Sequence, residues 1–234
     1  MGPTRATIKV TLFDLDHTLL PIDSDHAWGV FTTRIGWTDP VAFAQRNEDF
    51  YLHYQAGTLD VHDYVRFATQ AVRERGEQAA HAARVDFMRS VVQPAIRPEA
   101  LELVRRHQRA GDTVAIITAT NEFVTRPIAD AFGVPDLIAV ELARDHTPGG
   151  SGWITGEING VPSMREGKVT RFEQWLQDRA LKRQDIRLTF YSDSPNDLPL
   201  LEHADEPVAT NPDTRLRAIA DGRGWRILDL FPRT

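Results

Sequence analysis

Two aspartates that follow an apolar segment are the residues of this chain whose types and spacing point most clearly to chemistry. Asp14 and Asp16 stand in the run FDLDHT, and residues 7–13 have the composition of a buried strand. Two carboxylates this close repel each other, and a cation between them or a proton on one relieves the repulsion. Such oxygen-rich sites suit Mg²⁺, and one carboxylate can then act as nucleophile while the other carries a proton. An ordinary strand-to-loop turn is the alternative, because Asp is common in turns.

Three further segments place polar side chains at the ends of predicted strands or near a helix start. These are Thr118 and Thr120 in TVAIITAT, Lys168 in REGKVTRF, and Asp193 with Asp197 in YSDSPNDLPLL. In an open parallel α/β sheet, ligands bind at the carboxyl ends of the strands. One crevice could therefore collect all of these groups.

In the order and context of these motifs, the chain resembles the haloacid dehalogenase superfamily of phosphohydrolases. DLDHT is similar to that family's Asp-x-Asp-x-Thr, Thr118 to its Ser/Thr, Lys168 to its Lys/Arg, and Asp193 with Asp197 to its acidic fourth motif. The resemblance spans roughly residues 9–210 and is closest to the phosphoserine-phosphatase-like branch. The chain departs from that branch at Thr118, where Ser is frequent, and at Ser192, where Gly usually precedes the acidic pair.

The resemblance implies an α/β fold, with a Rossmann-like parallel-sheet core, an inserted helical-bundle cap and a small β-hairpin flap. We expect residues 1–21 and 93–234 to form the core and residues 22–92 the cap. Residues 23–92 show helical periodicity and no convincing strand, as in Trp28, Phe31 and Ile35. An insert of about 70 residues is too long for a loop in a compact domain, which favours four short helices. Gly57 and Gly76 are expected to end helices and Asp60 to begin one.

The remaining elements are predicted from periodicity and from turn residues. Pro127 predicts a kink or a late start in its helix, and Asn211-Pro212 predicts a helix start. The predicted helices are 98–109, 121–132, 166–181 and a short one after Pro195; the predicted strands are 113–117, 136–140, 187–191, 207–210 and 225–230; and the two strands of the hairpin are placed at 153–155 and 157–159.

The charges explain why such a site would need a cation. A phosphate monoester is a dianion, and a carboxylate about 4 Å away is repelled by about 4 kcal/mol per pair of unit charges at an effective dielectric of 20. Mg²⁺ held by Asp14, Asp193 and the main-chain carbonyl of Asp16, with Asp197 in support, would offset this repulsion. Lys168 would add positive charge and Thr118 a hydroxyl donor. Asp14 is then the nucleophile that forms an aspartyl-phosphate, and Asp16 is the acid and base.

The substrate is expected to be a small phosphate monoester that Thr118, Thr120 and Lys168 hold by its phosphate. The segment PIDSDH brings Asp23, Asp25 and His26 next to the catalytic loop, and acidic groups suit a cationic leaving group. LLPIDSDHAWG also resembles members of this branch that act on histidinol phosphate, an ester of an alcohol with an amine, an imidazole and no carboxylate. Two alternatives stay open. Asp23 and Asp25 could cap the first helix of the insert, and Arg46, Arg66 and Arg73 could bind the carboxylate of phosphoserine.

Composition excludes several other classes. The chain has 234 residues, no cysteine and a formal net charge of −6, which excludes thiolate chemistry and disfavours a nucleic-acid partner. No apolar run approaches the ~20 residues of a membrane span, so we expect a soluble cytoplasmic protein, either a monomer or a weak homodimer. A receiver domain carries its phospho-acceptor on a mid-chain strand, and a dehalogenase does not need Asp16. A phosphotransferase and a catalytically silent phosphate-binding regulator remain alternatives.

Overall fold

The core of the molecule is a parallel β-sheet. The structure, a computed structural model, describes residues 7–56 and 58–231. Within these residues the sheet has six strands in the order β3-β2-β1-β6-β7-β8, and every neighbouring pair is parallel. The strands are β1 (Ile8–Phe13), β2 (Thr113–Asn121), β3 (Asp136–Val140), β6 (Ile186–Ser192), β7 (Glu206–Thr210) and β8 (Arg226–Leu228). This arrangement confirms the predicted Rossmann-like core.

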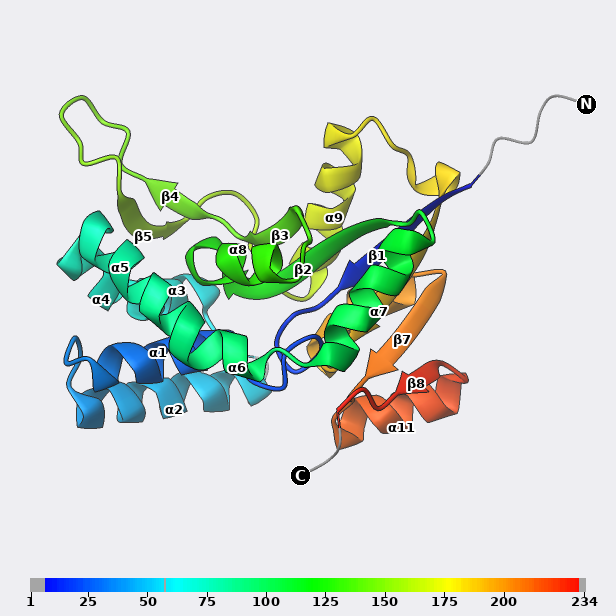
Figure 1. Cartoon of the computed structure of the whole chain (residues 1–234), viewed down its shortest axis with the longest axis horizontal. Coiled ribbons are helices and arrows are strands. Elements are labelled where there is room, and N and C mark those ends of the chain that lie inside the picture. Colours follow the sequence, from blue (N-terminus) through cyan, green and yellow to red (C-terminus); the bar gives the residue numbers. More distant parts are fainter. Residues whose placement is uncertain (1–6, 57, 232–234) are drawn as a thin grey trace, which may run out of the picture.

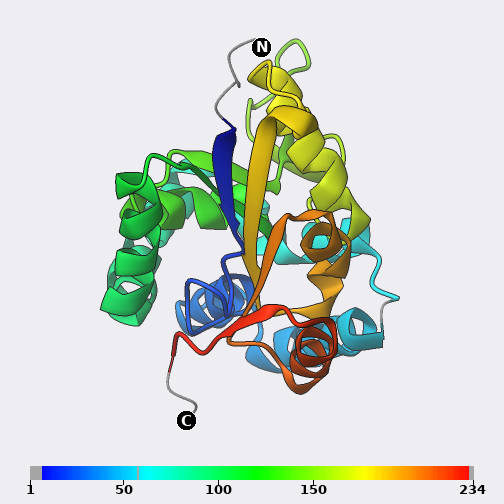
Figure 2. The same cartoon turned by 90° about the vertical axis from the view of Figure 1, so that its right-hand side faces the viewer.

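Helices cover both faces of the sheet. α7 (Pro98–Arg109) and α8 (Glu122–Ala131) lie on one face, and α9 (Glu166–Asp178), α10 (Leu198–His203) and α11 (Thr214–Arg223) lie on the other (Figure 2). Successive residues of β1 point to opposite faces, so Leu12 packs with the second group of helices and Phe13 with the first. Both faces are therefore apolar, as expected for a parallel sheet covered on each side.

The insert after β1 is helical, as predicted, but it has one more helix than expected. Among the described residues it contains α1 (Ser24–Arg34), α2 (Pro40–Ala56), α3 (Val61–Ala68), α4 (Gln70–Arg75) and α5 (Glu77–Phe87), and a π-helical turn (Met88–Val92) and α6 (Gln93–Ala95) follow. Asp60 accepts the N–H groups of His62 and Asp63 at the start of α3. Gly76, at a φ of 79°, ends α4. The prediction for Gly57 lies outside the described residues.

Figure 1 shows these helices on one side of the sheet, together with a β-hairpin that leaves the core after β3. The hairpin is confirmed, but its predicted strands were wrong. β4 (Leu142–Arg144) pairs antiparallel with β5 (Ile154–Ile158), so the two stretches assigned to separate strands mostly form one. The alternation in sequence marked β5 correctly, whereas β4 is too short to show a period.

α8 begins at Glu122 and contains Pro127, so the late start that Pro127 could have caused does not occur. One other local prediction needs correction. Asp213, not Asn211, caps α11, because its Oδ1 accepts the N–H of Leu216 at 2.6 Å. Asn211 instead adopts a φ of 47° and its Nδ2 donates to the carbonyl of His17 at 2.9 Å. It therefore supports the loop that follows β1 rather than the helix that follows β7.

Candidate active site

The carboxyl ends of β1, β2 and β6 bring together the polar groups that follow them in sequence. β1 lies between the other two strands, with Phe13 in register with Ile116 and Tyr191. The main-chain N–H of Asp14 continues this ladder by donating to the carbonyl of Tyr191 at 2.9 Å. Asp14 is thereby held at the sheet edge, with β2 on one side and β6 on the other.

Lys168 links two of the carboxylates. Its Nζ lies 2.7 Å from Asp14 Oδ1 and 2.7 Å from Asp197 Oδ2, and the residue is only 2% exposed. Burial alone would lower the pKa of Lys168, but the attraction of the two carboxylates overrides burial and raises it. The lysine is therefore charged at neutral pH. Asp197 Oδ2 also accepts a hydrogen bond from Ser192 Oγ at 2.7 Å.

A close approach of the backbone sets the position of Lys168. A Cβ at Gly167 would lie 2.0 Å from the carbonyl oxygen of Pro162, so only glycine allows the first turn of α9 to sit this close. Ser163, next in the chain, is fully buried and donates to the carbonyl of Thr118 at 2.5 Å. The segment between the hairpin and α9 thus fixes both Lys168 and the end of β2.

Thr18 joins the first and fourth motifs. Its Oγ1 accepts the main-chain N–H of Asp193 at 3.0 Å, and lies 3.1 Å from Asp193 Oδ1 and 3.3 Å from Asp14 Oδ2. The hydroxyl is fully buried between the two carboxylates.

The carboxylates outnumber the cations at this edge. Asp14 and Asp197 share the ammonium of Lys168, and Asp193 lies beside them next to Thr18. These three carboxylates and one ammonium leave an excess of two negative charges if all are ionised. Burial, with repulsion from Asp197, raises the pKa of Asp14 to about 6, even though Lys168 lowers it. Burial and the charges of Asp14 and Asp197 raise the pKa of Asp193 well above its usual value. A divalent cation bound by oxygen atoms would offset this excess.

Side chains alone supply only part of the oxygen ligands that Mg²⁺ would need at this site. Within residues 7–56 and 58–231, no three acidic or histidine side chains converge to a ready metal site. Asp197 and the carboxylate of Asp16 have partners of their own. A main-chain carbonyl and water would have to complete the coordination of Asp14 and Asp193, as is common for this ion.

The Asp16 carboxylate lies between the insert and the core. Its Oδ1 accepts the main-chain N–H of Ser24 at 2.7 Å and its Oδ2 accepts the hydroxyl of Thr120 at 2.9 Å. Burial, followed by the charge of Asp23, raises the pKa of Asp16 well above the usual range. A carboxyl group with a raised pKa can hold a proton and release it during a reaction.

Three of the proposed substrate-binding residues lie at the start of α1, in different surroundings. Asp23 caps α1 by accepting the N–H of His26 at 2.8 Å, and His26 is exposed next to Asn47. Asp25 is buried, and its Oδ2 accepts the hydroxyl of Tyr64 at 2.6 Å. Burial raises the pKa of Asp25 to about 7, although the bond from Tyr64 lowers it. The helix-cap alternative therefore holds for Asp23 and not for Asp25.

The structure adds aromatic residues of the insert that sequence reasoning missed. The phenol of Tyr54 in α2 lies within reach of Asn196 and Ser194, and burial raises its pKa to about 12. Burial, followed by the nearby charges of Asp25, Asp23 and Asp16, raises the pKa of Tyr64 well above its usual value. Helical periodicity marked both rings as interior, but not which interior they face.

Comparisons with known proteins agree with this geometry. Residues 11–202 match the model of the haloacid dehalogenase-like hydrolase family. A histidinol-phosphatase of Neisseria meningitidis is 39% identical over 94% of this chain and 98% of its own length. The phosphoserine phosphatase SerB1 of Mycobacterium tuberculosis is 29% identical over 93% of this chain and 69% of its own length.

Solved structures show the same architecture. A Bordetella pertussis protein of unknown function superposes with a TM-score of 0.90 at 44% identity, covering 97% of this chain and 100% of that one. A phosphoserine phosphatase in its phospho-aspartyl intermediate analogue form superposes with a TM-score of 0.64 at 16% identity, covering 95% of this chain and 93% of that one. At that identity the second likeness concerns the fold alone.

Proposed function

Because this chain belongs to the family of haloacid dehalogenase-like hydrolases and is a phosphatase of that family, we propose that it is a Mg²⁺-dependent enzyme that hydrolyses histidinol phosphate through Asp14. The arrangement of Asp14 against Lys168, with 2.7 Å between their polar atoms, is the observation that carries the chemistry. The relative that is 39% identical over nearly its whole length carries the choice of substrate.

The reaction follows from the positions of these groups. Asp14 attacks phosphorus, a bond forms between its oxygen and phosphorus, and the bond from phosphorus to the leaving oxygen breaks. Asp16 donates its proton to that oxygen, then accepts one from the water that attacks the phosphorus of the aspartyl-phosphate and frees Asp14. Lys168 and Thr118 hold the phosphoryl oxygens, and the charge of Lys168 stabilises the transferring group.

A metal would add to this charge. Asp14, Asp193 and the main-chain carbonyl of Asp16 would hold Mg²⁺. Asp197 would support these ligands through its ion pair with Lys168, and the bound ion would supply positive charge beside the phosphoryl oxygens. The excess of carboxylates over cations at this edge supports the assignment.

The surroundings of the leaving group are acidic. Asp16, Asp23 and Asp25 lie near one another, since the charge of Asp23 raises the pKa of both others. This supports an alcohol that carries an amine and an imidazole. The arginines that could have bound the carboxylate of phosphoserine have other partners. Arg66 pairs with Asp63 and Glu157, and Arg73 donates to the carbonyl of Arg66. Arg46 lies over the ring of Phe50.

The test compares kcat/KM for histidinol phosphate and O-phosphoserine in Mg²⁺, in EDTA and in Asp14→Asn. We expect a preference of about 100-fold or more for histidinol phosphate, because phosphoserine brings a carboxylate into an acidic pocket. EDTA and Asp14→Asn should each abolish turnover. Asp86→Asn, which alters an exposed carboxylate on α5 paired with Arg89, is the matched control.

The outcomes separate the two parts of the proposal. Equal rates on the two esters, or faster hydrolysis of phosphoserine, would reject the substrate and leave the chemistry standing. Full activity of Asp14→Asn would reject the nucleophile, and full activity in EDTA would reject the metal.

A further inference from the structure

We propose that Thr120 and the first N–H of helix α1 are positioning groups that hold the Asp16 carboxyl for proton transfer. The position of the inserted helices against the core then sets the geometry of this acid. The inference rests on the proposed function, in which Asp16 protonates the leaving oxygen. Thr120 was expected to bind substrate, and its contact with Asp16 gives it a different role.

The two contacts of Asp16 come from opposite sides of the boundary between insert and core. Ser24 is the first residue of α1 and donates from the insert at 2.7 Å, whereas Thr120 is the last residue but one of β2 and donates from the core at 2.9 Å. Two hydrogen bonds to different oxygens of one carboxyl group fix its rotation as well as its place. If α1 moved away from the sheet, Asp16 would lose one of them.

The chemical types of the two donors differ in a way that suits an acid–base. A main-chain N–H only donates, so Asp16 Oδ1 must present a lone pair to Ser24. The hydroxyl of Thr120 can donate to an ionised carboxylate and can accept from a protonated one. Thr120 therefore keeps a hydrogen bond to Oδ2 whether or not that oxygen carries the proton, whereas a group that only donates would lose its bond to a protonated Oδ2.

A local irregularity of β2 places Thr120 there. Ile117 pairs with Ile138 and Asn121 with Val140, so four residue steps of β2 correspond to two of β3. The groups released from the ladder find other partners, because the N–H of Thr120 donates to Thr118 Oγ1 at 3.1 Å and the carbonyl of Thr118 accepts from Ser163. Bulged strands re-aim side chains near active sites in this way.

The first experiment changes the core contact. Wild type, Thr120→Val and Thr120→Ser are compared in Mg²⁺ on p-nitrophenyl phosphate, whose leaving group departs as a stable anion, and on glycerol 2-phosphate, whose alkoxide needs a proton. For Thr120→Val we expect the rate of the phosphorylation step, in which Asp14 attacks phosphorus, to fall about 10- to 100-fold with glycerol 2-phosphate. With p-nitrophenyl phosphate this rate should fall less than about threefold. Rapid-quench measurements should show a burst of p-nitrophenol, because the second step, in which Asp16 activates water, becomes slow.

Two variants show whether the effect belongs to the hydroxyl. Thr120→Ser restores a hydroxyl and should return both esters to within about threefold of wild type. Thr125→Val removes a buried hydroxyl that donates only to the carbonyl of Asn121, and should leave the ratio of the two rates unchanged. The unfolding midpoint of each variant reports whether it is folded.

The second experiment removes the N–H of α1 without ending the helix. Proline is tolerated at the first helical position and requires an extended residue before it, and Asp23 has a φ of −84° and a ψ of 113°. Ser24→Pro therefore deletes the N–H that Asp16 accepts, and Ser24→Ala changes only the side chain. With glycerol 2-phosphate, we expect the rate of the phosphorylation step in Ser24→Pro to be about 10-fold or more below that of Ser24→Ala. With p-nitrophenyl phosphate the difference between the two variants should be smaller.

Three results would overturn the proposal. One is an equal loss in the rate of the phosphorylation step on both esters in Thr120→Val. Another is a rise in KM with the rates of both steps unchanged, and the third is a Thr120→Ser variant as slow as Thr120→Val. If wild type hydrolysed neither of these esters nor histidinol phosphate, the proposed function itself would be rejected, an outcome distinct from these three.

Discussion

At the scale of single residues, Asp25 shows how burial without a cation changes a carboxyl group. It is 9% exposed, and its bonds come from the hydroxyl of Tyr64 and, at 3.4 Å, from the amide of Asn121. These contacts do not offset the loss of water, so the pKa rises from 3.8 to about 7. In the proposed function, Asp25 receives a cationic group of the substrate.

The same shift predicts a pH dependence of stability. Between pH 4 and 7 the folded state keeps a proton on Asp25 that the unfolded chain has lost, so stability falls as the pH rises through this window. Asp25→Asn removes the titrating carboxyl group. As the pH rises from 4 to 8, the free energy of unfolding of the variant should therefore increase relative to that of wild type, by up to about 4 kcal/mol. Urea unfolding in EDTA at several pH values measures it, with Asp86→Asn as the exposed control. A constant difference between variant and wild type would contradict the prediction.

Gly167 gives a prediction about positioning. In Gly167→Ala the new methyl group would meet the carbonyl of Pro162, and α9 would have to shift together with Lys168. We expect a stability loss of about 1–3 kcal/mol and a clear fall in kcat. Gly222→Ala in α11 meets nothing within 4 Å, and should gain about 0.5–1 kcal/mol at unchanged kcat. Unchanged kcat in Gly167→Ala would mean that α9 tolerates the shift.

At the scale of elements, α8 depends on a side chain from the insert. Pro127 has no N–H to donate to the carbonyl of Phe123 four residues earlier. Arg84 of α5 donates to that carbonyl at 2.8 Å and lies over the ring of Phe123 at 4.6 Å. The helix therefore continues through its proline, and the missing bond becomes a link between insert and core.

A double-mutant cycle tests this link. Arg84→Met should cost about 1–2 kcal/mol, because it leaves the carbonyl of Phe123 without its donor. Pro127→Ala restores the N–H, so the cost of Arg84→Met should be smaller in that background. Urea unfolding of the four proteins gives the coupling energy. Equal costs in both backgrounds would show that Arg84 acts only through packing on Phe123.

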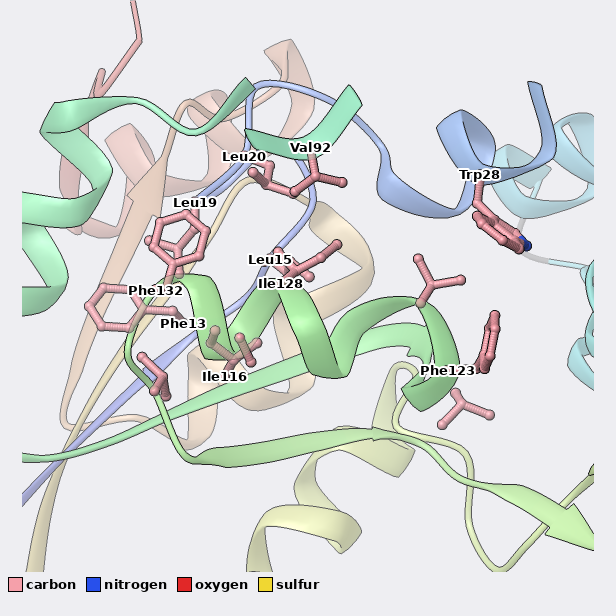
Figure 3. Close-up of a cluster of buried hydrophobic side chains, with 14 of the residues drawn as sticks. Phe13, Leu15, Leu19, Leu20, Trp28, Val92, Ile116, Phe123, Ile128 and Phe132 are labelled. Atoms are coloured by element: carbon pink, nitrogen blue, oxygen red, sulfur yellow. The ribbon is translucent and has the colours of Figure 1, made fainter. Parts of the chain in front are cut away.

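At the scale of the whole molecule, one hydrophobic cluster runs from the sheet into the insert. It joins Phe13 and Ile116 of the core to Trp28 and Phe87 of the insert, and Figure 3 shows Trp28 facing Phe123 across the boundary. The hairpin adds a second attachment, since Trp153 packs on Phe123 and Glu157 pairs with Arg66. α1, α3 and α5 are therefore held to the core.

α2 is attached much less. Among its described side chains only Phe50 is fully buried, and Tyr54 touches the loop that carries Asp197. We expect closure over the substrate to involve residues 36–60 more than the rest of the insert. With BeF₃⁻ and Mg²⁺, amide exchange should slow most in α2 and least in α5. Equal protection of both helices would indicate that the whole insert moves, and no change anywhere would reject closure.

No helix in the described ranges is long and apolar enough to cross a membrane. The fold could be anticipated because its elements have strong periodicity. Apolar runs of strand length alternate with amphipathic helices, a pattern that favours a parallel sheet covered on both faces.

The sequence by itself determined which residues could form the site. Asp14 and Asp193 each follow an apolar strand and Thr118 lies near the end of a third. Parallel strands end at one edge, so local patterns alone predict that these residues share that edge. Lys168 was marked by its place near a helix start. The helical nature of residues 24–34 and 40–56 also needed only local periodicity.

Only the tertiary structure decided how these residues are held. Thr18 meets Asp193 across 175 positions and Asp16 meets Thr120 across 104, and such contacts depend on strand register and on where the insert sits. No periodic pattern in the sequence indicates the register shift in β2 that orients Thr120, the Arg84 hydrogen bond that replaces the one lost at Pro127, or the support that Asn211 gives to the loop after β1. Each depends on contacts between distant segments, and the packing of the whole chain, rather than neighbouring residues, decides the partners.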